Sequence, residues 1–268
     1  RLADGRGGFM SHTLFLVPTE PERQQLAPAL AAGLDTAPRI ELCGFGPVAA
    51  AARTAALITE HAPQRVMLIG IAGRLDARLE IGAAYRFDRV ACYGVGAGSG
   101  DGFISAAALG WSQWPGDPPD PEAAVGDVID CEAAAGVAAP SGLLLTACAA
   151  SASADDVARR TTLFPAAVAE DMEGFGVALA CRLAGVSLTI IRGISNTAGD
   201  RDHARWRVPE ALAAAAGLAP RILADGGAGL PEQDAPAIAP GNQRRFPRSI
   251  ERGQSMDARS HGPLEEPR

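Results

Sequence analysis

Aromatic residues are scarce in this 268-residue sequence: they make up 5% of it, whereas hydrophobic residues as a whole make up 47%. Charged residues account for 21%. The hydrophobic and charged proportions are both ordinary for a folded globular protein. Alanine, by contrast, is abundant. We therefore expect an aliphatic core in which neighbouring elements approach closely, within one large domain or two small ones.

Long apolar runs and clustered positive charge are also missing. No run reaches the roughly 18–20 residues that a membrane-spanning helix needs, and residues 1–11 hold glycines and charges in place of the apolar stretch of a signal peptide. The net charge of −7 argues against a nucleic-acid-binding surface. The sequence thus predicts a cytoplasmic protein without a membrane or nucleic-acid partner, with Met10 as a candidate start and residues 1–10 as an unstructured extension.

Cysteine pairs are absent as well. The five cysteines are spread singly, without a C-x-x-C motif, and the four histidines are equally scattered. This pattern favours small, buried, apolar side chains over disulfides or metal ligands. We predict no metal site and no cofactor. The cysteines are Cys43, Cys92, Cys131, Cys148 and Cys181.

What the sequence does contain is an alternation of strand-like and helix-like segments. This alternation predicts an α/β fold: one domain over residues 11–225, with a central, mixed but mostly parallel sheet flanked by helices. The strand-like runs are 13–17, 39–43, 65–69, 83–92, 143–146, 166–169 and 186–192. The helix-like runs are 21–32, 47–60, 126–137, a segment that opens at Ser153, 172–183 and 209–223.

Two segments fall outside this alternation. Residues 93–121 are rich in glycine, proline and tryptophan without a clear period, and a loop of this length in a compact domain is usually functional or mobile. Residues 226–268 hold few large apolar side chains among many Pro, Gly, Arg, Gln and Ser residues. Such a segment buries too little surface to offset its ordering entropy, so we predict a disordered tail.

A glycine motif follows the second strand-like run. Gly44–Ala49 matches the dinucleotide-binding pattern G-x-G-x-x-A at the start of a helix. However, that pattern belongs after the first strand, and the next strand here ends in Leu68, Ile69 and Gly70, without the acid that would bind a ribose hydroxyl. The motif is better explained as a tight turn that lets helix and strand approach closely.

Polar side chains gather where predicted strands end. Glu20 and Glu22 follow the first strand, Glu170–Gly174 joins a strand to a helix, and the run from Ile190 ends in Ser195 and Asn196. Ligands of such sheets bind beyond the carboxyl ends of the strands. Crowded acids are unfavourable unless water or a ligand solvates them. The pattern therefore predicts a site at this edge.

The order and spacing of these motifs resemble the purine nucleoside phosphorylase and nucleosidase superfamily. The likeness covers about Thr13 to Leu223, and it is closer to the futalosine hydrolases than to the methylthioadenosine/S-adenosylhomocysteine nucleosidases. It is carried by the acid after the first strand, Gly44–Ala51, Gly70–Gly73, Asp171–Gly174 and Arg192–Asn196. The resemblance implies hydrolysis of a nucleoside without cofactor or metal, by a homo-oligomer.

The resemblance also implies roles for particular residues. Glu173 would accept hydrogen bonds from the ribose hydroxyls, with Met172 packed against the sugar. Glu22, or alternatively Glu20, would be the base that activates water, as the cleavage of a glycosidic bond through an oxocarbenium-like sugar requires. Further substrate contacts would come from Ile71, Ala72 and Gly73 in the glycine turn, from Ala150, and from Ser195.

Asn196 bears on the choice of base. Adenosine-type nucleosidases have an aspartate at the matching position, which protonates the purine N7. An asparagine cannot supply that proton, but its NH₂ group can donate to a 6-oxo group while its oxygen accepts from a protonated N7. A 6-amino group would place a donor opposite the NH₂ donor and leave buried polar groups unpaired, which costs about 1–3 kcal/mol of binding free energy. Asn196 thus favours hypoxanthine or guanine, and futalosine carries hypoxanthine.

Two departures from the superfamily pattern carry further expectations. Leu68 and Ile71 stand where the phosphorylases bind phosphate with an arginine and a serine, so water is the expected nucleophile. Ala150 stands where nucleosidases stack a phenylalanine on the purine.

Futalosine also carries a carboxyphenyl ketone arm at the 5′ end of its sugar, whose carboxylate calls for an arginine. We expect Arg201 to meet that carboxylate, with Arg205 and Arg207 as alternatives. The apolar walls of the arm's subsite are expected from the long loop. The candidate walls are Phe103, Trp111 and Trp114.

Three other functions remain compatible with these residues. They are a methylthioadenosine/S-adenosylhomocysteine-type nucleosidase, a 6-oxopurine nucleoside phosphorylase, and a nucleoside-binding protein without activity. Base preference, phosphate dependence and base release, respectively, distinguish them from a futalosine hydrolase.

Overall fold

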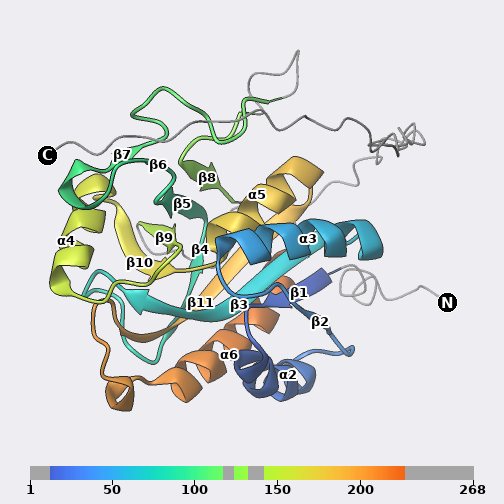
Figure 1. The fold of residues 1–268 in the computed structure, drawn as a ribbon. Coiled ribbons are helices and arrows are strands. Elements are labelled where there is room, and N and C mark those ends of the chain that lie inside the picture. The colour runs from blue at the N-terminus through green and yellow to red at the C-terminus, as the bar shows by residue number, and fades with distance from the viewer. Residues whose placement is uncertain (1–12, 117–123, 132–141, 227–268) are drawn as a thin grey trace, which may run out of the picture. The chain divides into compact units, whose positions relative to one another are not determined.

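The computed structural model describes residues 13–116, 124–131 and 142–226 (Figure 1). The strands of its main sheet are β1 (Thr13–Val17), β2 (Arg39–Leu42), β3 (Arg65–Arg74), β4 (Ala84–Phe87), β5 (Arg89–Tyr93), β8 (Val128–Asp130), β9 (Leu143–Ala147), β10 (Ala167–Asp171) and β11 (Ser187–Thr197). The α-helices are α2 (Glu20–Gly33), α3 (Pro47–His61), α4 (Ala154–Leu163), α5 (Gly174–Ala184) and α6 (Val208–Gly226). A short hairpin joins β6 (Gly96–Ala97) to β7 (Ile104–Ser105).

The nine strands form one mixed sheet in the order β2-β1-β3-β10-β9-β5-β8, with β11 paired to both β3 and β4. Parallel pairs join β1 to β2 and β3, β11 to β3, and β9 to β10 and β5. Antiparallel pairs join β10 to β3, β4 to β11, and β8 to β5. The predicted fold class, a mixed and mostly parallel sheet flanked by helices, is confirmed.

Helices cover both faces of this sheet. In Figure 1, α3 and α5 lie together on one side of it, and α2 and α6 lie together on the other. Because successive side chains of a strand point to opposite faces, β1 contributes to two cores: Leu14 and Leu16 pack on the α3/α5 side, whereas Phe15 and Val17 pack on the α2/α6 side. A strand that is buried on both faces has a continuous run of apolar residues in its sequence.

Two predictions of secondary structure are wrong. The helix expected at 126–137 is, in its described part, the strand β8, because Ile129 packs into the core and the segment pairs with β5. The single strand expected at 83–92 is two strands separated by Asp88, since β4 pairs with β11 while β5 pairs with β9. The extension predicted at 1–10 and, apart from Gly226 at the end of α6, the tail predicted at 226–268 lie outside the described residues.

The five cysteines are free thiols. Cys43, Cys92 and Cys181 are buried as expected, and burial raises the pKa of Cys43 to about 12 and that of Cys92 to about 11. Cys148 departs from the expectation, because it is exposed and lines the cavity described below. Among the helices described, none is both long enough and apolar enough to span a bilayer.

Candidate active site

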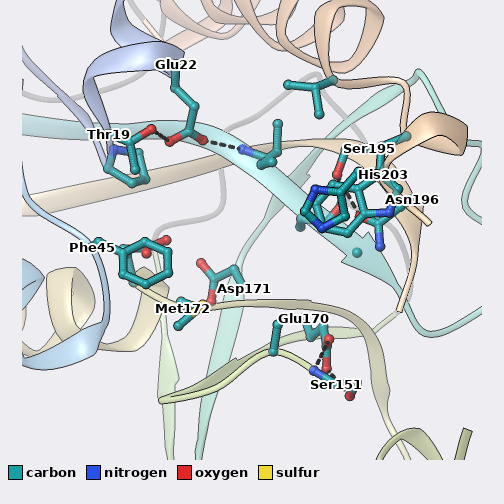
Figure 2. Close-up of a pocket in the computed structure, with 18 of the residues that line it drawn as sticks. Thr19, Glu22, Phe45, Ser151, Glu170, Asp171, Met172, Ser195, Asn196 and His203 are labelled. Carbon is teal, nitrogen blue, oxygen red and sulfur yellow. Dashed lines mark hydrogen bonds between the residues drawn. The ribbon is translucent and has the colours of Figure 1, made fainter. Parts of the chain in front are cut away.

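A cavity of about 700 Å³ lies where the C-terminal parts of β3, β10 and β11 meet (Figure 2). Its walls come from the segments that follow β1 and β9 and from the ends of these three strands, as the position of ligands in α/β sheets predicts. The lining residues used below are Thr19, Glu22, Phe45, Ile71, Ala72, Gly73, Cys148, Ala150, Ser151, Glu170, Asp171, Met172, Glu173, Ser195, Asn196, Arg201, His203 and Trp206.

Glu22 lies in the first turn of α2, where its negative charge is favoured by the helix dipole. It is buried, and its two carboxylate oxygens accept from different donors: Oε1 from the Ile71 backbone N–H at 3.0 Å and Oε2 from the Thr19 hydroxyl at 2.6 Å. Glu20 is half-buried at the surface, pairs with Arg23 at 2.8 Å, and is not among the described residues that line the cavity. The geometry therefore brings Glu22, and not Glu20, to the cavity.

A fully buried arginine, Arg192, lies behind Glu22. Its Nε donates to Asp171 Oδ2 at 3.0 Å and its Nη2 to Glu173 Oε2 at 3.3 Å. Its Nη1 has no hydrogen-bond partner among the described residues. A side chain on Gly70 would collide with that Nη1 and would come within 2.9 Å of Glu22 Oε1. Gly70 thus leaves the room in which the free N–H of Arg192 approaches the Glu22 carboxylate.

Glu173 is held at the start of α5, next to Met172 on the cavity wall. Its Oε1 accepts from the Gly46 backbone N–H at 3.1 Å, so the glycine turn before α3 directs this donor at a carboxylate. Burial raises the pKa of Glu173 to about 7, against the lowering effect of Arg192 and with a further rise from Asp171. Asp171 ties this region together, because its carboxylate accepts hydrogen bonds from Arg192, from the Thr146 hydroxyl and from the Gly174 backbone N–H.

Asn196 lies in a bulge of β11, where the pairing with β3 shifts register between Ile194 and Asn196. The bulge turns both Ser195 and Asn196 toward the cavity. The Ser195 hydroxyl donates to Asn196 Oδ1 at 2.8 Å, and Asn196 Nδ2 donates to the Thr197 carbonyl at 2.9 Å. A carboxamide has two N–H donors and two lone pairs on its oxygen, so one of each remains for a ligand.

The segment after β9 is held by a buried network that sequence reasoning missed. Glu170 Oε1 accepts from the Ser151 backbone N–H at 2.8 Å, and Oε2 accepts from the Ser151 hydroxyl and from Arg160 Nη1, both at 2.7 Å. Arg160 also donates from Nη2 to the Ala149 carbonyl at 2.7 Å, and its guanidinium lies over the Tyr93 ring. The network fixes the wall on which Ala150 lies.

An aromatic group with an arginine forms another part of the wall. His203 stacks on Trp206 with ring centroids 4.4 Å apart, and the Arg201 guanidinium lies 5.4 Å from the Trp206 ring centroid. All three line the cavity. Phe45, on the glycine turn, also lines it and is 66% exposed.

Several residues expected at the arm's subsite lie elsewhere. Arg205 pairs with Asp200 at 2.8 Å, and Arg207 pairs with Glu210 at 3.3 Å. The structure places the three aromatic residues expected from the long loop away from this cavity: Phe103 packs on Tyr93, Trp111 is 72% exposed and Trp114 packs against the core. None of these five is among the described residues that line the cavity. Trp206 and His203, which follow β11, provide the aromatic wall instead.

In the described residues, no group of three His, Cys, Asp and Glu side chains could hold a metal ion. The polar side chains that line the cavity are carboxylates, hydroxyls, two carboxamides (Gln25 and Asn196), the His203 imidazole and the Arg201 guanidinium. Such a set suits a ligand that carries hydroxyls, a partly cationic centre and a heterocycle with donors and acceptors.

Comparison with known proteins shows the superfamily to which the chain belongs. The family model described as the phosphorylase superfamily matches residues 34–225. A methylthioadenosine/S-adenosylhomocysteine nucleosidase from Colwellia psychrerythraea, solved in complex with adenine, has a similar structure with a TM-score of 0.61; the match is 22% identical and covers 80% of this chain and 94% of that one. The chain thus belongs to the phosphorylase superfamily and has a fold similar to that of this nucleosidase.

Sequence relatives narrow the family. A futalosine hydrolase from Streptomyces coelicolor is 36% identical over 176 residues, which are 64% of this chain and 72% of that protein. A futalosine hydrolase from Thermus thermophilus is 31% identical over 195 residues, which are 70% of this chain and 82% of that protein. The chain therefore belongs to the futalosine hydrolase family within the phosphorylase superfamily.

Proposed function

We propose that this chain is an N-glycosidase that hydrolyses futalosine to hypoxanthine and dehypoxanthinyl futalosine. One observation carries the proposal: a single cavity brings together Glu22, Glu173 with Arg192, and the neutral Asn196. A carboxylate that activates water, a carboxylate that anchors the sugar and a neutral group that recognises the base are what cleavage of an oxopurine nucleoside requires. The family membership supports the same reaction.

In the proposed mechanism, Glu22 activates the attacking water. Within the part of the chain that the structure describes, each Glu22 oxygen accepts one hydrogen bond and keeps a lone pair, and Arg192 Nη1, which has no partner there, lies beside Oε1. A water bound between them would receive a hydrogen bond from Arg192 and donate to Glu22. As the C1′–N9 bond breaks, the water oxygen bonds to C1′ and its proton passes to Glu22.

The departing base would be stabilised at its other side. Protonation of N7 by a proton from solvent lets the electrons of the broken bond remain on a neutral purine. Asn196 Oδ1 has a lone pair for that N7–H, and Nδ2 has an N–H for the 6-oxo group. Glu173 would accept from the ribose hydroxyls and place negative charge near the cationic sugar.

The charges of the site support water over phosphate as the nucleophile. Glu22, Asp171 and Glu173 surround Arg192, so three acids face one guanidinium. In addition, the Ile71 N–H that could bind a phosphate oxygen donates to Glu22. A phosphate dianion would meet like charges there, whereas an oxocarbenium-like sugar is stabilised by them.

Asn196→Ala is expected to lower kcat/KM for futalosine by at least about 10–100-fold, because the 6-oxo group and the protonated N7 would lose their partners at about 1–3 kcal/mol. Steady-state release of hypoxanthine measures this loss. The folded state should persist, since the hydrogen bonds of the replaced side chain to other described residues are those to Ser195 and Thr197. Full activity of a folded variant would refute the role of the carboxamide.

Arg201→Met is expected to raise KM for futalosine by about 10-fold, because an arginine–carboxylate contact contributes about 1.5–3 kcal/mol when charged groups pair. Inosine, which lacks the carboxyphenyl arm, serves as the control, and its kcat/KM should change by less than about twofold. Arg205→Met, at an arginine outside the cavity lining, is the matched variant. Equal losses for both nucleosides would contradict the assignment.

We also propose that the enzyme acts in menaquinone biosynthesis, in the cytoplasm, as a homo-oligomer. The futalosine substrate supports the pathway, and the five free thiols suit a reducing compartment. Exposed apolar side chains support association with a second copy: Phe45 on the cavity wall, Val48 in the first turn of α3 and Ile104 on the β6–β7 hairpin.

The proposed function is tested by a chromatographic panel of futalosine, inosine, aminofutalosine and methylthioadenosine, with the Glu22→Ala variant as the inactive control. Hypoxanthine from futalosine is the expected main product. Preference for methylthioadenosine would indicate an adenosine-type nucleosidase. If the protein bound futalosine but released no base, it would be a nucleoside-binding protein.

A further inference from the structure

We propose that Glu170 is a specificity residue, whose carboxylate accepts a hydrogen bond from the N1–H of a 6-oxopurine. This inference rests on the proposed function. A 6-oxopurine carries a proton on N1, whereas a 6-aminopurine has a lone pair there, so a carboxylate at N1 would attract the first base and repel the second. Glu170 would thus act together with Asn196, but at a different atom of the base.

The carboxylate of Glu170 has capacity for this contact. A carboxylate accepts at about four lone-pair positions, and three are used: one on Oε1 by the Ser151 N–H, and two on Oε2 by the Ser151 hydroxyl and Arg160 Nη1. One position on Oε1 remains. Glu170 is 5% exposed and lines the cavity, so a ligand there would be its natural partner.

The sheet places Glu170 and Asn196 on either side of one glycine. Gly73 of β3 is the register partner of Glu170 on β10 and of Asn196 on β11. Because neighbouring strands lie about 4.8 Å apart, the backbones of the two residues lie about 10 Å apart, with no side chain on residue 73 between them. A flat base with hydrogen bonds of about 2.9 Å on both sides fits a gap of this size.

The order of atoms on the purine matches this arrangement. N1–H, the 6-oxo group and N7 follow one another along a single edge of hypoxanthine. With Asn196 at N7 and the oxo group, the N1–H faces the opposite strand, where Glu170 lies (Figure 2). This contact needs a negatively charged carboxylate. Arg160 is its counterion and pairs with Glu170 at 2.7 Å.

The alternative is that Glu170 only holds Ser151 in place. The two roles differ in what they change. A positioning role affects 6-oxo and 6-amino substrates alike, because the wall of the cavity would move for both. A contact with N1 changes the ratio between them, because a carboxylate and a carboxamide present different groups to the base: Glu170→Gln can offer an N–H to the N1 lone pair of adenine.

The experiment measures kcat/KM for futalosine and for aminofutalosine, which differ at the 6 position of the base. In Glu170→Gln, the ratio of the two is expected to fall by about 10–100-fold, from the reversal of one buried hydrogen bond. Ser151→Ala, which removes a donor to Glu170 but keeps the carboxylate and Arg160, should leave the ratio within about twofold. A ratio that is unchanged in a folded Glu170→Gln variant would overturn the proposal.

A second measurement needs no variant, and serves if Glu170→Gln does not fold. In the unaltered protein with bound ¹⁵N-labelled hypoxanthine, the N1 proton should move downfield and exchange slowly with water. Rapid exchange of that proton in the saturated complex would overturn the proposal. If the unaltered protein releases no hypoxanthine from futalosine and does not bind it, the proposed function fails; if it does both and only the ratio or the N1 proton disagrees, the inference about Glu170 alone fails.

Discussion

Glu22→Gln should lower kcat for futalosine hydrolysis by about 10²–10⁴-fold, the contribution that a positioned general base makes. A glutamine keeps the size of the side chain and one acceptor oxygen for the Ile71 N–H, but it cannot take the proton of the attacking water. Binding should change little, so KM is expected to stay within a few-fold. Initial rates of hypoxanthine release over a range of futalosine concentrations give both constants.

Glu20→Gln is the matched control, because Glu20 lies two residues away in the same helical turn but pairs with Arg23 at the surface. Its kcat should equal that of the unaltered protein. If the Glu20 variant lost activity while the Glu22 variant kept it, the nucleophilic water would have to be activated from outside the cavity described here, and the assignment of the base would be wrong.

Glu173→Gln should lower kcat/KM for futalosine by about 10²–10³-fold, since it removes a charge that stabilises the cationic sugar in the transition state. The pH profile provides a second test. Burial raises the pKa of Glu173 to about 7 in the ligand-free protein, and the ionised form is the one that accepts from two ribose hydroxyls. The kcat/KM of the unaltered enzyme should therefore rise with pH through about 7, and the variant should lack this limb.

The same substitution should stabilise the fold at alkaline pH. A carboxyl whose pKa is higher in the folded than in the unfolded chain contributes stability below its unfolded pKa of about 4.5, and that contribution is lost as pH rises through about 7. Glutamine cannot ionise, so the difference in Tm between variant and parent should grow in favour of the variant from pH 5 to pH 8. A lower Tm of the variant at pH 8 would show that the charge is needed for folding.

The fold could be predicted from the sequence where strands are buried on both faces. The continuous apolar runs of β1 and β3 and the caps and prolines of the helices identify their elements without tertiary information. β8 could not be predicted this way, because its three residues are a strand only through their pairing with β5. The split of β4 from β5 likewise depends on two different partners.

Part of the site could be predicted for a similar reason. Glu22 and Glu173 follow strands and Asn196 lies near the end of β11, and the ends of the strands gather at one edge whatever the details of packing. The position of Arg192 inside an apolar strand also predicts that acids surround it, because a buried charge must be paired. The contacts of Glu170 with Ser151 and Arg160 join three separate segments, and no spacing along the chain indicates which arginine will meet which acid.

The aromatic wall of the cavity shows the limit most clearly. Three aromatic residues of the long loop were equally plausible walls by composition, and the structure instead places Trp206 and His203 on the cavity. Trp206 is held by its Nε1–H bond to the Asp200 carbonyl at 3.1 Å, within the turn after β11. Its orientation follows from that turn.

The central claim is that water, and not phosphate, attacks the sugar of a 6-oxopurine nucleoside in the cavity around Glu22. Its most direct test is a time course of futalosine cleavage by the purified protein in phosphate-free buffer and in buffer with excess phosphate, with both products identified by mass spectrometry. Equal rates, with hypoxanthine and the free sugar as products in both buffers, are the predicted result. Release of hypoxanthine only with phosphate, together with a sugar 1-phosphate, would contradict the claim.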